Sequence, residues 1–128
     1  MKKALYLGLD ASTQSLTAMA VDEAARRIVH VAAINYERDL PQYGVRAGVL
    51  PNPDPRIAHA PPRLWAEALD TLLGRLRAGG LDLSAVRALA VSGQQHGSVY
   101  LNAEAEARLA ALRPDRPLAE RSEERRVG

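Results

Sequence analysis

Two short polar segments each follow an apolar run of the chain, and their residue types are suited to binding chemistry. The first segment, Asp-Ala-Ser-Thr-Gln, begins at Asp10. Backbone N–H groups in such a turn can converge on an anion, and Ser12, Thr13 and Gln14 add side-chain donors. Asp10 adds a carboxylate of the kind that Mg²⁺ uses beside water and substrate phosphates. The segment predicts a half-site for a phosphate chain with its metal ion. An ordinary hairpin turn is the alternative, because Asp, Ser and Thr are common in turns.

The second segment, Gly-Gln-Gln-His-Gly, begins at Gly93. Its glycines permit a sharp turn and the close approach of a ligand. Gln94, Gln95 and His96 both donate and accept hydrogen bonds, as a polyol requires, because each of its hydroxyls does both. His96 could also act as a base near neutral pH, although we favour hydrogen bonding. The alternative is a glycine-rich turn with a structural histidine. Together the two segments predict a kinase that acts on a sugar.

Composition narrows the class of protein. The 128 residues are 47% hydrophobic and 25% charged, which suits one globular unit. The net charge of +2 is too balanced to predict a nucleic-acid or membrane-surface partner. The absence of cysteine excludes disulfides and thiolate metal sites, and His30 and His59 have no second ligand at useful spacing. No apolar stretch has the length of a signal sequence or of a membrane span, so we expect a cytoplasmic protein.

The pattern of apolar residues predicts an α/β fold that starts with a three-stranded antiparallel meander. Apolar and β-branched runs separated by turn residues indicate the strands, and leucines at helical spacing indicate the main helix. Proline and glycine mark a long loop. The first strand is apolar throughout and the fourth is mostly apolar, so we expect both to be buried. In order, the expected elements are strands over 4–9, 16–21 and 28–36, a loop over 39–62, a helix from Pro62 to the glycines at 79 and 80, strands over 86–91 and 98–101, and a helix over 103–112.

The last eight residues, 121–128, differ from the rest because they are mostly charged and show no apolar periodicity. They resemble the translation of a common sequencing adapter, which predicts that the natural sequence is truncated near Glu120 and that the tail is non-native. A solvated, frayed terminus is the alternative.

Several motifs recur in one order along residues 4–120 and together resemble the xylulose kinase branch of the FGGY carbohydrate kinase family. The motif that ends at Gln14 is similar to the first phosphate motif of the actin-like ATPases, many of which have glycine where this chain has Ser12. It is no Walker A loop, since Gly-Lys-Ser/Thr does not follow. The quoted motifs are Leu-Gly-Leu-Asp-Ala-Ser-Thr-Gln from Leu7, Arg-Asp-Leu-Pro from Arg38 with Tyr-Gly from Tyr43, Leu-Trp from Leu64, and Ser-Gly-Gln-Gln-His-Gly-Ser-Val-Tyr from Ser92.

The resemblance implies an ATP-dependent and Mg²⁺-dependent kinase with two actin-like domains, of which residues 1–120 form the N-terminal part of the first. It also implies that the meander begins the mixed sheet of this domain, which would be incomplete in these residues. The γ-phosphate of ATP would pass to a hydroxyl of D-xylulose, giving D-xylulose 5-phosphate. Asp10 would help to hold Mg²⁺, residues 12–14 would face the ATP phosphates, and Gln95 and His96 would contact the sugar. The catalytic aspartate base and the adenosine site would lie later in the family's sequence, so we expect the isolated chain to be inactive.

Other functions stay open from the sequence. Within the family, ribulose, gluconate and glycerol kinases share this architecture, and hydroxyl discrimination depends on several loops. Outside the family, the alternatives are a chaperone-type or filament-forming actin-like ATPase and a non-catalytic actin-like binding module. We also expect poor autonomous stability, because the sheet of an incomplete domain exposes an edge.

Overall fold

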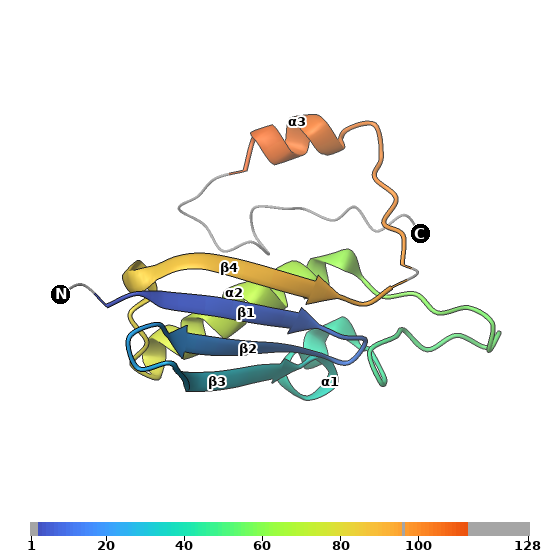
Figure 1. The fold of residues 1–128 in the computed structure, drawn as a ribbon. Coiled ribbons are helices and arrows are strands. Elements are labelled where there is room, and N and C mark those ends of the chain that lie inside the picture. Colours follow the sequence, from blue (N-terminus) through green and yellow to red (C-terminus); the bar gives the residue numbers. More distant parts are fainter. Residues whose placement is uncertain (1–2, 96, 113–128) are drawn as a thin grey trace. The chain divides into compact units, whose positions relative to one another are not determined.

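A computed structural model of the chain describes residues 3–95 and 97–112 (Figure 1). It divides into two units between Gln95 and His96, and only α3 belongs to the second. The predicted non-native tail at 121–128 lies outside the described residues. In chain order the elements are β1 (Leu5–Ala11), β2 (Ser15–Asp22), β3 (Arg27–Asn35), α1 (Tyr36–Asp39), the 3-10 turn η1 (Pro41–Tyr43), α2 (Pro62–Ala78), the 3-10 turn η2 (Leu83–Ala85), β4 (Val86–Gly93) and α3 (Ala105–Ala110).

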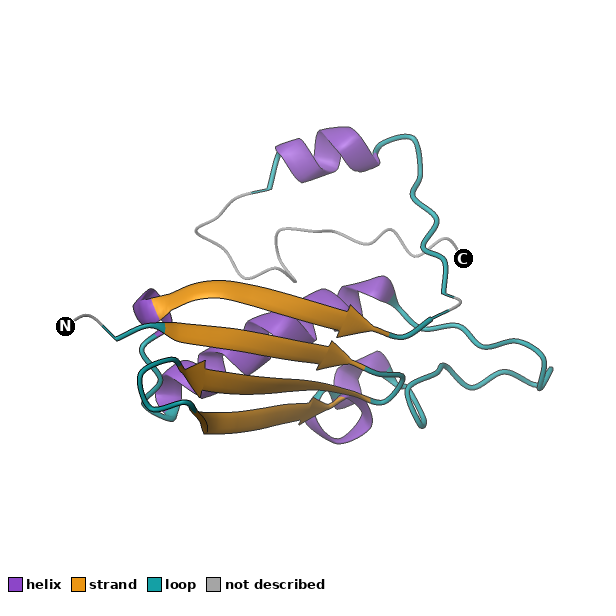
Figure 2. Cartoon of the chain, in the orientation of Figure 1, coloured by secondary structure: helices purple, strands orange, loops and turns teal. Residues whose placement is uncertain are grey.

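The first unit is built on a four-stranded mixed sheet in the order β3-β2-β1-β4 (Figures 1 and 2). The first three strands pair antiparallel, and β4 returns parallel to β1. A parallel return needs a connection of a dozen or more residues, which the segment containing α2 provides. The predicted α/β fold, with a mixed sheet that begins with an antiparallel meander, is confirmed.

Helix α2 packs on one face of the sheet and forms the core with it. Pro62 stands in its first turn, where a missing N–H is tolerated, and the helix ends before Gly79 as predicted. Its fully buried residues recur at every fourth position and therefore form one stripe: Leu64, Ala68, Leu72 and Leu76. Opposite them lie the inward-facing residues of β1 and β2: Leu5, Leu7, Leu9, Leu16, Ala18 and Ala20. Each buried leucine contributes about 2 kcal/mol of transfer free energy.

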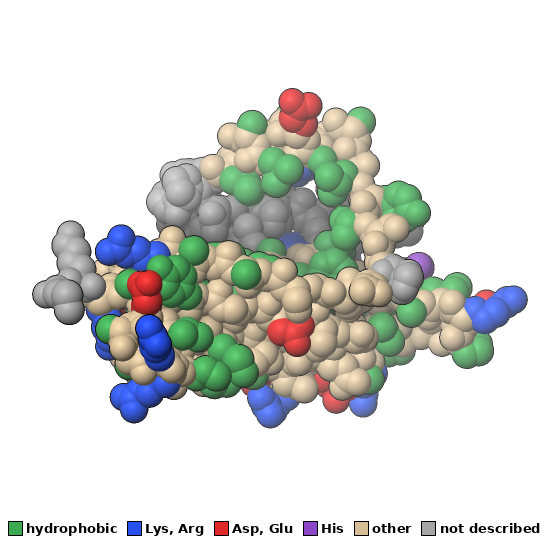
Figure 3. All heavy atoms as spheres, in the orientation of Figure 1, with side chains coloured by type: hydrophobic (Ala, Val, Ile, Leu, Met, Phe, Trp, Pro, Cys, Tyr) green, Lys and Arg blue, Asp and Glu red, His purple; other side chains and the backbone are tan. Residues whose placement is uncertain are grey.

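The other face of the sheet is open in the described part of the chain. Side chains of β1 alternate between buried and exposed, and Tyr6, Met19 and Val31 on the open face are 39%, 44% and 55% exposed. The edge strand β4 is exposed on both faces, since Leu89 and Val91 are 59% and 60% exposed although they pair with the buried Leu7 and Leu9. Figure 3 looks onto this face, where hydrophobic side chains lie over the strands and basic ones gather at the margins. The expectation that the first and fourth strands are buried is therefore wrong, because α2 covers only one face of β1 and leaves both faces of β4 exposed.

Both strands that lead into the polar segments are longer than predicted. β1 continues through Asp10 and Ala11, because both pair with β2, so the turn shrinks to residues 12–14. β4 likewise includes Ser92 and Gly93, which pair with β1. Backbone pairing with a neighbouring strand thus extends each of the two strands into residues whose types favour turns.

The second unit, residues 97–112, contains α3, which is shorter than the helix predicted over 103–112. The strand predicted over 98–101 is wrong, since these residues form no strand. A short apolar run becomes a strand by pairing with a neighbour, and Tyr100 and Leu101 remain 93% and 72% exposed. None of the helices within the described ranges has the length and apolar character needed to cross a membrane.

The third strand ends one residue earlier than predicted because a short helix begins there. Asn35 caps α1, and its side-chain oxygen accepts the backbone N–H of Arg38 at 2.9 Å. Tyr36, predicted as the last residue of the strand, is instead the first residue of this helix.

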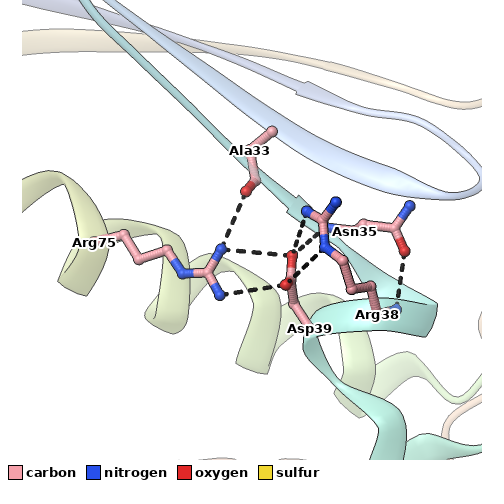
Figure 4. Close-up of polar contacts among 5 residues, drawn as sticks. All are labelled: Ala33, Asn35, Arg38, Asp39 and Arg75. Carbon is pink, nitrogen blue, oxygen red and sulfur yellow. Dashed lines mark hydrogen bonds and ion pairs between the residues drawn. The ribbon is translucent and has the colours of Figure 1, made fainter.

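Asp39, the last residue of α1, ties three elements together (Figure 4). Its carboxylate accepts the backbone N–H of Asn35 at 2.8 Å, and Arg38 donates to both its oxygens at 3.1 Å. Arg75 of α2 lies 3.4 Å from the same carboxylate and also donates to the carbonyl of Ala33 at 3.4 Å. The pKa of the Asp39 carboxyl is held well below its usual range, chiefly by the bond from Arg38 and further by the bonds from Asn35 and Arg75.

Replacing Asp39 by Asn should lower the free energy of unfolding by about 2 kcal/mol at neutral pH, because Arg75 loses its charged partner and the charged hydrogen bonds weaken. A carboxyl whose pKa is lowered on folding stabilises the fold above the pKa of the unfolded state, about 4, and loses this contribution as the pH falls below it. The difference between wild type and Asp39→Asn should therefore shrink in acid. Urea titrations followed by the fluorescence of Trp65, the single tryptophan, would measure it.

Asp54→Asn is a matched control for this experiment. Asp54 also pairs with an arginine, Arg56, at 2.9 Å, but that arginine is 88% exposed and only two residues away. The control should leave the free energy of unfolding unchanged. An Asp39→Asn effect that equals the control, or one that does not vary with pH, would contradict the prediction.

Candidate functional site

The two polar segments leave the sheet at the same edge, because β1 and β4 are parallel neighbours (Figure 1). Their register sets Asp10 opposite Ser92 and Ala11 opposite Gly93. The Ser92 hydroxyl donates to Oδ1 of Asp10 at 2.7 Å. Sequence analysis missed Ser92 as a partner of Asp10, because only the parallel register brings together residues that are 82 positions apart.

Asp10 lies on the open face of the sheet at a groove of about 460 Å³. Ser92 engages one of its carboxylate oxygens, while the other, Oδ2, accepts no hydrogen bond from the residues that the structure describes. A carboxylate with one fixed and one open oxygen is suited to a cation. The rest of the groove is lined mainly by small and apolar residues: Gly8, Leu9, Thr17, Met19, Ala90, Val91 and Ser92.

Among the residues that the structure describes, no acidic or histidine cluster surrounds Asp10. Across residues 3–95 and 97–112, no group of three or more His, Cys, Asp and Glu side chains is placed to hold a metal ion. A Mg²⁺ ion at Asp10 would therefore take its other ligands from phosphate oxygens and water, which is a common arrangement for this ion.

The turn at residues 12–14 is closed by Ser12 and Ser15. The Ser12 N–H donates to the Ser15 carbonyl at 2.9 Å, and the two hydroxyls lie 3.0 Å apart. The backbone N–H groups of Thr13 and Gln14, in contrast, meet no acceptor in the described part of the chain, and both residues are exposed. Two adjacent free N–H groups are able to bind an anion.

Ser12 fits this turn without backbone strain. The described residues other than glycine with positive φ are Arg26 and Ala47, so Ser12 keeps an ordinary backbone conformation. A glycine is therefore not required at this position for conformational reasons. The Ser12 hydroxyl differs from the other predicted donors, because it is already bonded within the turn.

Tyr36 contacts the turn through its backbone. Sequence analysis missed this residue because the run that contains it was predicted to be strand. Its backbone N–H donates to the Gln14 carbonyl at 3.0 Å. Its side chain is only 1% exposed, and burial raises the pKa of its hydroxyl, with a further rise from the charge of Asp10. The phenol thus stays neutral near neutral pH.

The second polar segment is described only in part. Gln94 and Gln95 follow β4 directly and are exposed, at the sheet edge where Asp10 also lies. His96 lies outside the described residues. The grouping of these three residues around one ligand stays a prediction.

Comparison with known proteins gives a consistent set of relatives. The chain is 40% identical over 112 residues to the xylulose kinase of Mus musculus, covering 88% of this chain and 20% of the relative. It is 42% identical over 108 residues to a probable D-xylulose kinase A of Arthroderma otae, covering 84% of this chain and 19% of the relative. No protein-family model matches.

Solved structures give the same result. A xylulose kinase from Brucella ovis matches with a TM-score of 0.61 and 30% identity, over 78% of this chain and 18% of that protein. A gluconate kinase from Lactobacillus acidophilus matches with a TM-score of 0.53 and 16% identity, over 72% and 16%, which is evidence for the fold alone. The actin-like fold and the resemblance to xylulose kinases are confirmed. The chain spans about one fifth of the length of these relatives.

Titrating tripolyphosphate into the ¹⁵N-labelled chain should shift the amide resonances of Thr13 and Gln14 more than those of any other described residue, because an anion would meet their free N–H groups. The amide of Ser12, already bonded to the Ser15 carbonyl, should move less. Shifts centred instead on the exposed arginines Arg26 and Arg27 would show non-specific binding and would contradict the prediction.

Proposed function

We propose that this chain is the N-terminal part of an ATP-dependent sugar kinase and that the complete enzyme converts D-xylulose to D-xylulose 5-phosphate. The proposal rests above all on one observation, the identity of about 40% to xylulose kinases over most of the chain. The site supports it, because a carboxylate with an open oxygen stands beside a turn with two free N–H groups, and the segment with the glutamines leaves the sheet at the same edge.

We assign the first polar segment to the nucleotide. Asp10, fixed by Ser92, would hold Mg²⁺, and the N–H groups of Thr13 and Gln14 would bind the phosphates of ATP. The metal ion supplies charge neutralisation for the phosphate oxygens when it is bound. Transfer of a phosphoryl group depends mainly on positioning and on stabilisation of charge, and a rigid turn at a strand end supports both. We expect the side chain of Gln14, which is exposed, to be a further donor and that of Ser12 to maintain the turn.

We assign the second polar segment to the sugar. Gln94, Gln95 and His96 would bind the hydroxyls of D-xylulose, with the side chains acting as both donors and acceptors. Ribulose, gluconate and glycerol are the alternative substrates, because discrimination among polyols depends on several loops. The catalytic base and the adenosine site would come from sequence beyond residue 120, so the first domain would be incomplete in residues 1–120.

The product of the uninterrupted gene should phosphorylate D-xylulose in the presence of Mg²⁺ and ATP. Asp10→Asn should lower its kcat about 100-fold or more, because charge stabilisation at the phosphates is lost. Asp70→Asn, at an exposed position on α2, is the matched control and should leave kcat unchanged. A coupled ADP-release assay with xylulose, ribulose, gluconate and glycerol would measure activity and substrate preference together. An Asp10→Asn enzyme with normal kcat would refute the assignment of Asp10.

The 128-residue chain by itself should show no xylulose-dependent ADP release, because the base and the adenosine site are assigned to later sequence. The same coupled assay measures this at enzyme concentrations high enough to detect slow turnover. Substrate-dependent turnover by the isolated chain would show that a complete active site is present and would overturn the assignment. A stop codon that proves authentic would favour a non-catalytic binding module instead.

A further inference from the structure

A tight turn in the proline-rich loop packs against the candidate phosphate turn. Residues 46–49 form a two-residue hairpin turn, in which Arg46 and Val49 exchange backbone hydrogen bonds of 2.7 and 3.1 Å. Gly48 in this turn is buried and has a φ of +88°. A Cβ atom placed on Gly48 would lie 1.9 Å from the carbonyl oxygen of Thr13. Only glycine therefore allows this approach.

Helix α1 also contacts the hairpin turn at residues 46–49. The backbone N–H of Ala47 donates to Oε1 of Glu37 at 3.0 Å. Tyr36, the neighbour of Glu37, donates its own N–H to the carbonyl of Gln14. A ring of contacts thus runs from the phosphate turn through α1 to residues 46–49 and back to the phosphate turn.

Peptide geometry gives this ring a consequence for the free N–H groups. The carbonyl of Thr13 and the N–H of Gln14 belong to one planar trans peptide, so they point in opposite directions. Because the carbonyl oxygen packs on Gly48, the N–H of Gln14 points away from the loop. The next peptide is fixed as well, since the carbonyl of Gln14 accepts the N–H of Tyr36.

We propose that residues 46–49 are a positioning element for the phosphate turn, with Gly48 and Glu37 as its positioning residues. Gly48 sets the plane of the peptide that carries the Gln14 N–H, and Glu37 holds Gly48 in place through Ala47. Neither residue touches the phosphates. This inference rests on the proposed function for its ligand, a chain of phosphates, while the steric argument stands on the contacts alone.

Gly44 provides a matched control for a substitution at Gly48. It also has a positive φ, +69°, but a Cβ there would meet no atom within 4 Å. Gly44→Ala and Gly48→Ala therefore share the cost of the left-handed backbone and differ in the contact with Thr13. For Glu37, the pair Glu37→Ala and Glu37→Gln separates loss of the acceptor from loss of charge, because the amide oxygen of glutamine can still accept from Ala47.

The experiment records ¹⁵N spectra of the full 128-residue chain during titration with tripolyphosphate. Gly48→Ala should shift the Gln14 amide before any ligand is added and should weaken tripolyphosphate binding about tenfold, as expected for one misdirected hydrogen bond to a charged ligand. Gly44→Ala should leave the Gln14 amide resonance in place and should change the affinity for tripolyphosphate by less than about twofold. Glu37→Ala should weaken binding by severalfold, and Glu37→Gln should restore it.

The outcomes distinguish a failure of the proposed phosphate site from a failure of the positioning element. Wild-type chain that binds no tripolyphosphate would refute the phosphate site of the proposed function, while the Gln14 shift of Gly48→Ala relative to Gly44→Ala would still test the positioning element. Equal effects of the two glycine variants on the Gln14 amide would overturn the positioning element. If Gly48→Ala fails to fold, the Glu37 pair decides, and equal binding by Glu37→Ala and Glu37→Gln would overturn the inference.

Discussion

The parallel pairing of β1 with β4 is the contact on which the candidate site depends. Two polar segments that are far apart in the sequence end at one edge because these strands are neighbours with matched register. The bond from Ser92 to Asp10 spans the pair directly. The pairing in turn depends on the segment containing α2, which carries the chain back to the start of the sheet and is anchored by its stripe of buried leucines and alanine. Stability of the helix and geometry of the site are therefore linked.

Helix α1, which has little stability of its own, links the core to the turn at residues 12–14. Four residues are too few for an isolated helix, so α1 is maintained by its surroundings. Asn35 caps it, and Asp39 connects it to Arg75 on α2. The helix then offers one backbone N–H to Gln14 and one carboxylate to Ala47. Polar bonds thus connect the core to the exposed turn, and the bond between α1 and α2 among them depends on the charge of Asp39.

Local patterns made most elements predictable from the sequence, and long-range contacts explain what was missed. Apolar and β-branched runs predicted the meander, apolar residues at helical spacing predicted α2, and residue type alone singled out Asp10 and the turn after it. The bond from Ser92 and the packing of Gly48 on Thr13 could not be predicted, because both depend on tertiary register. The same cause explains the longer strand ends at Asp10 and Ser92. The run at 98–101 has the composition of a strand, yet no strand pairs with it in the described residues.

The exposed outer edge of β4 has a consequence for how a longer protein would be made. When the ribosome has completed this first portion, an edge strand with exposed apolar side chains and unpaired backbone groups can pair with a strand of another chain. Synthesis proceeds at about 5–20 residues per second, so tens of seconds pass before several hundred further residues can be added. During that interval the exposed strand could pair with other chains, and slower synthesis of the following residues would lengthen its exposure to aggregation.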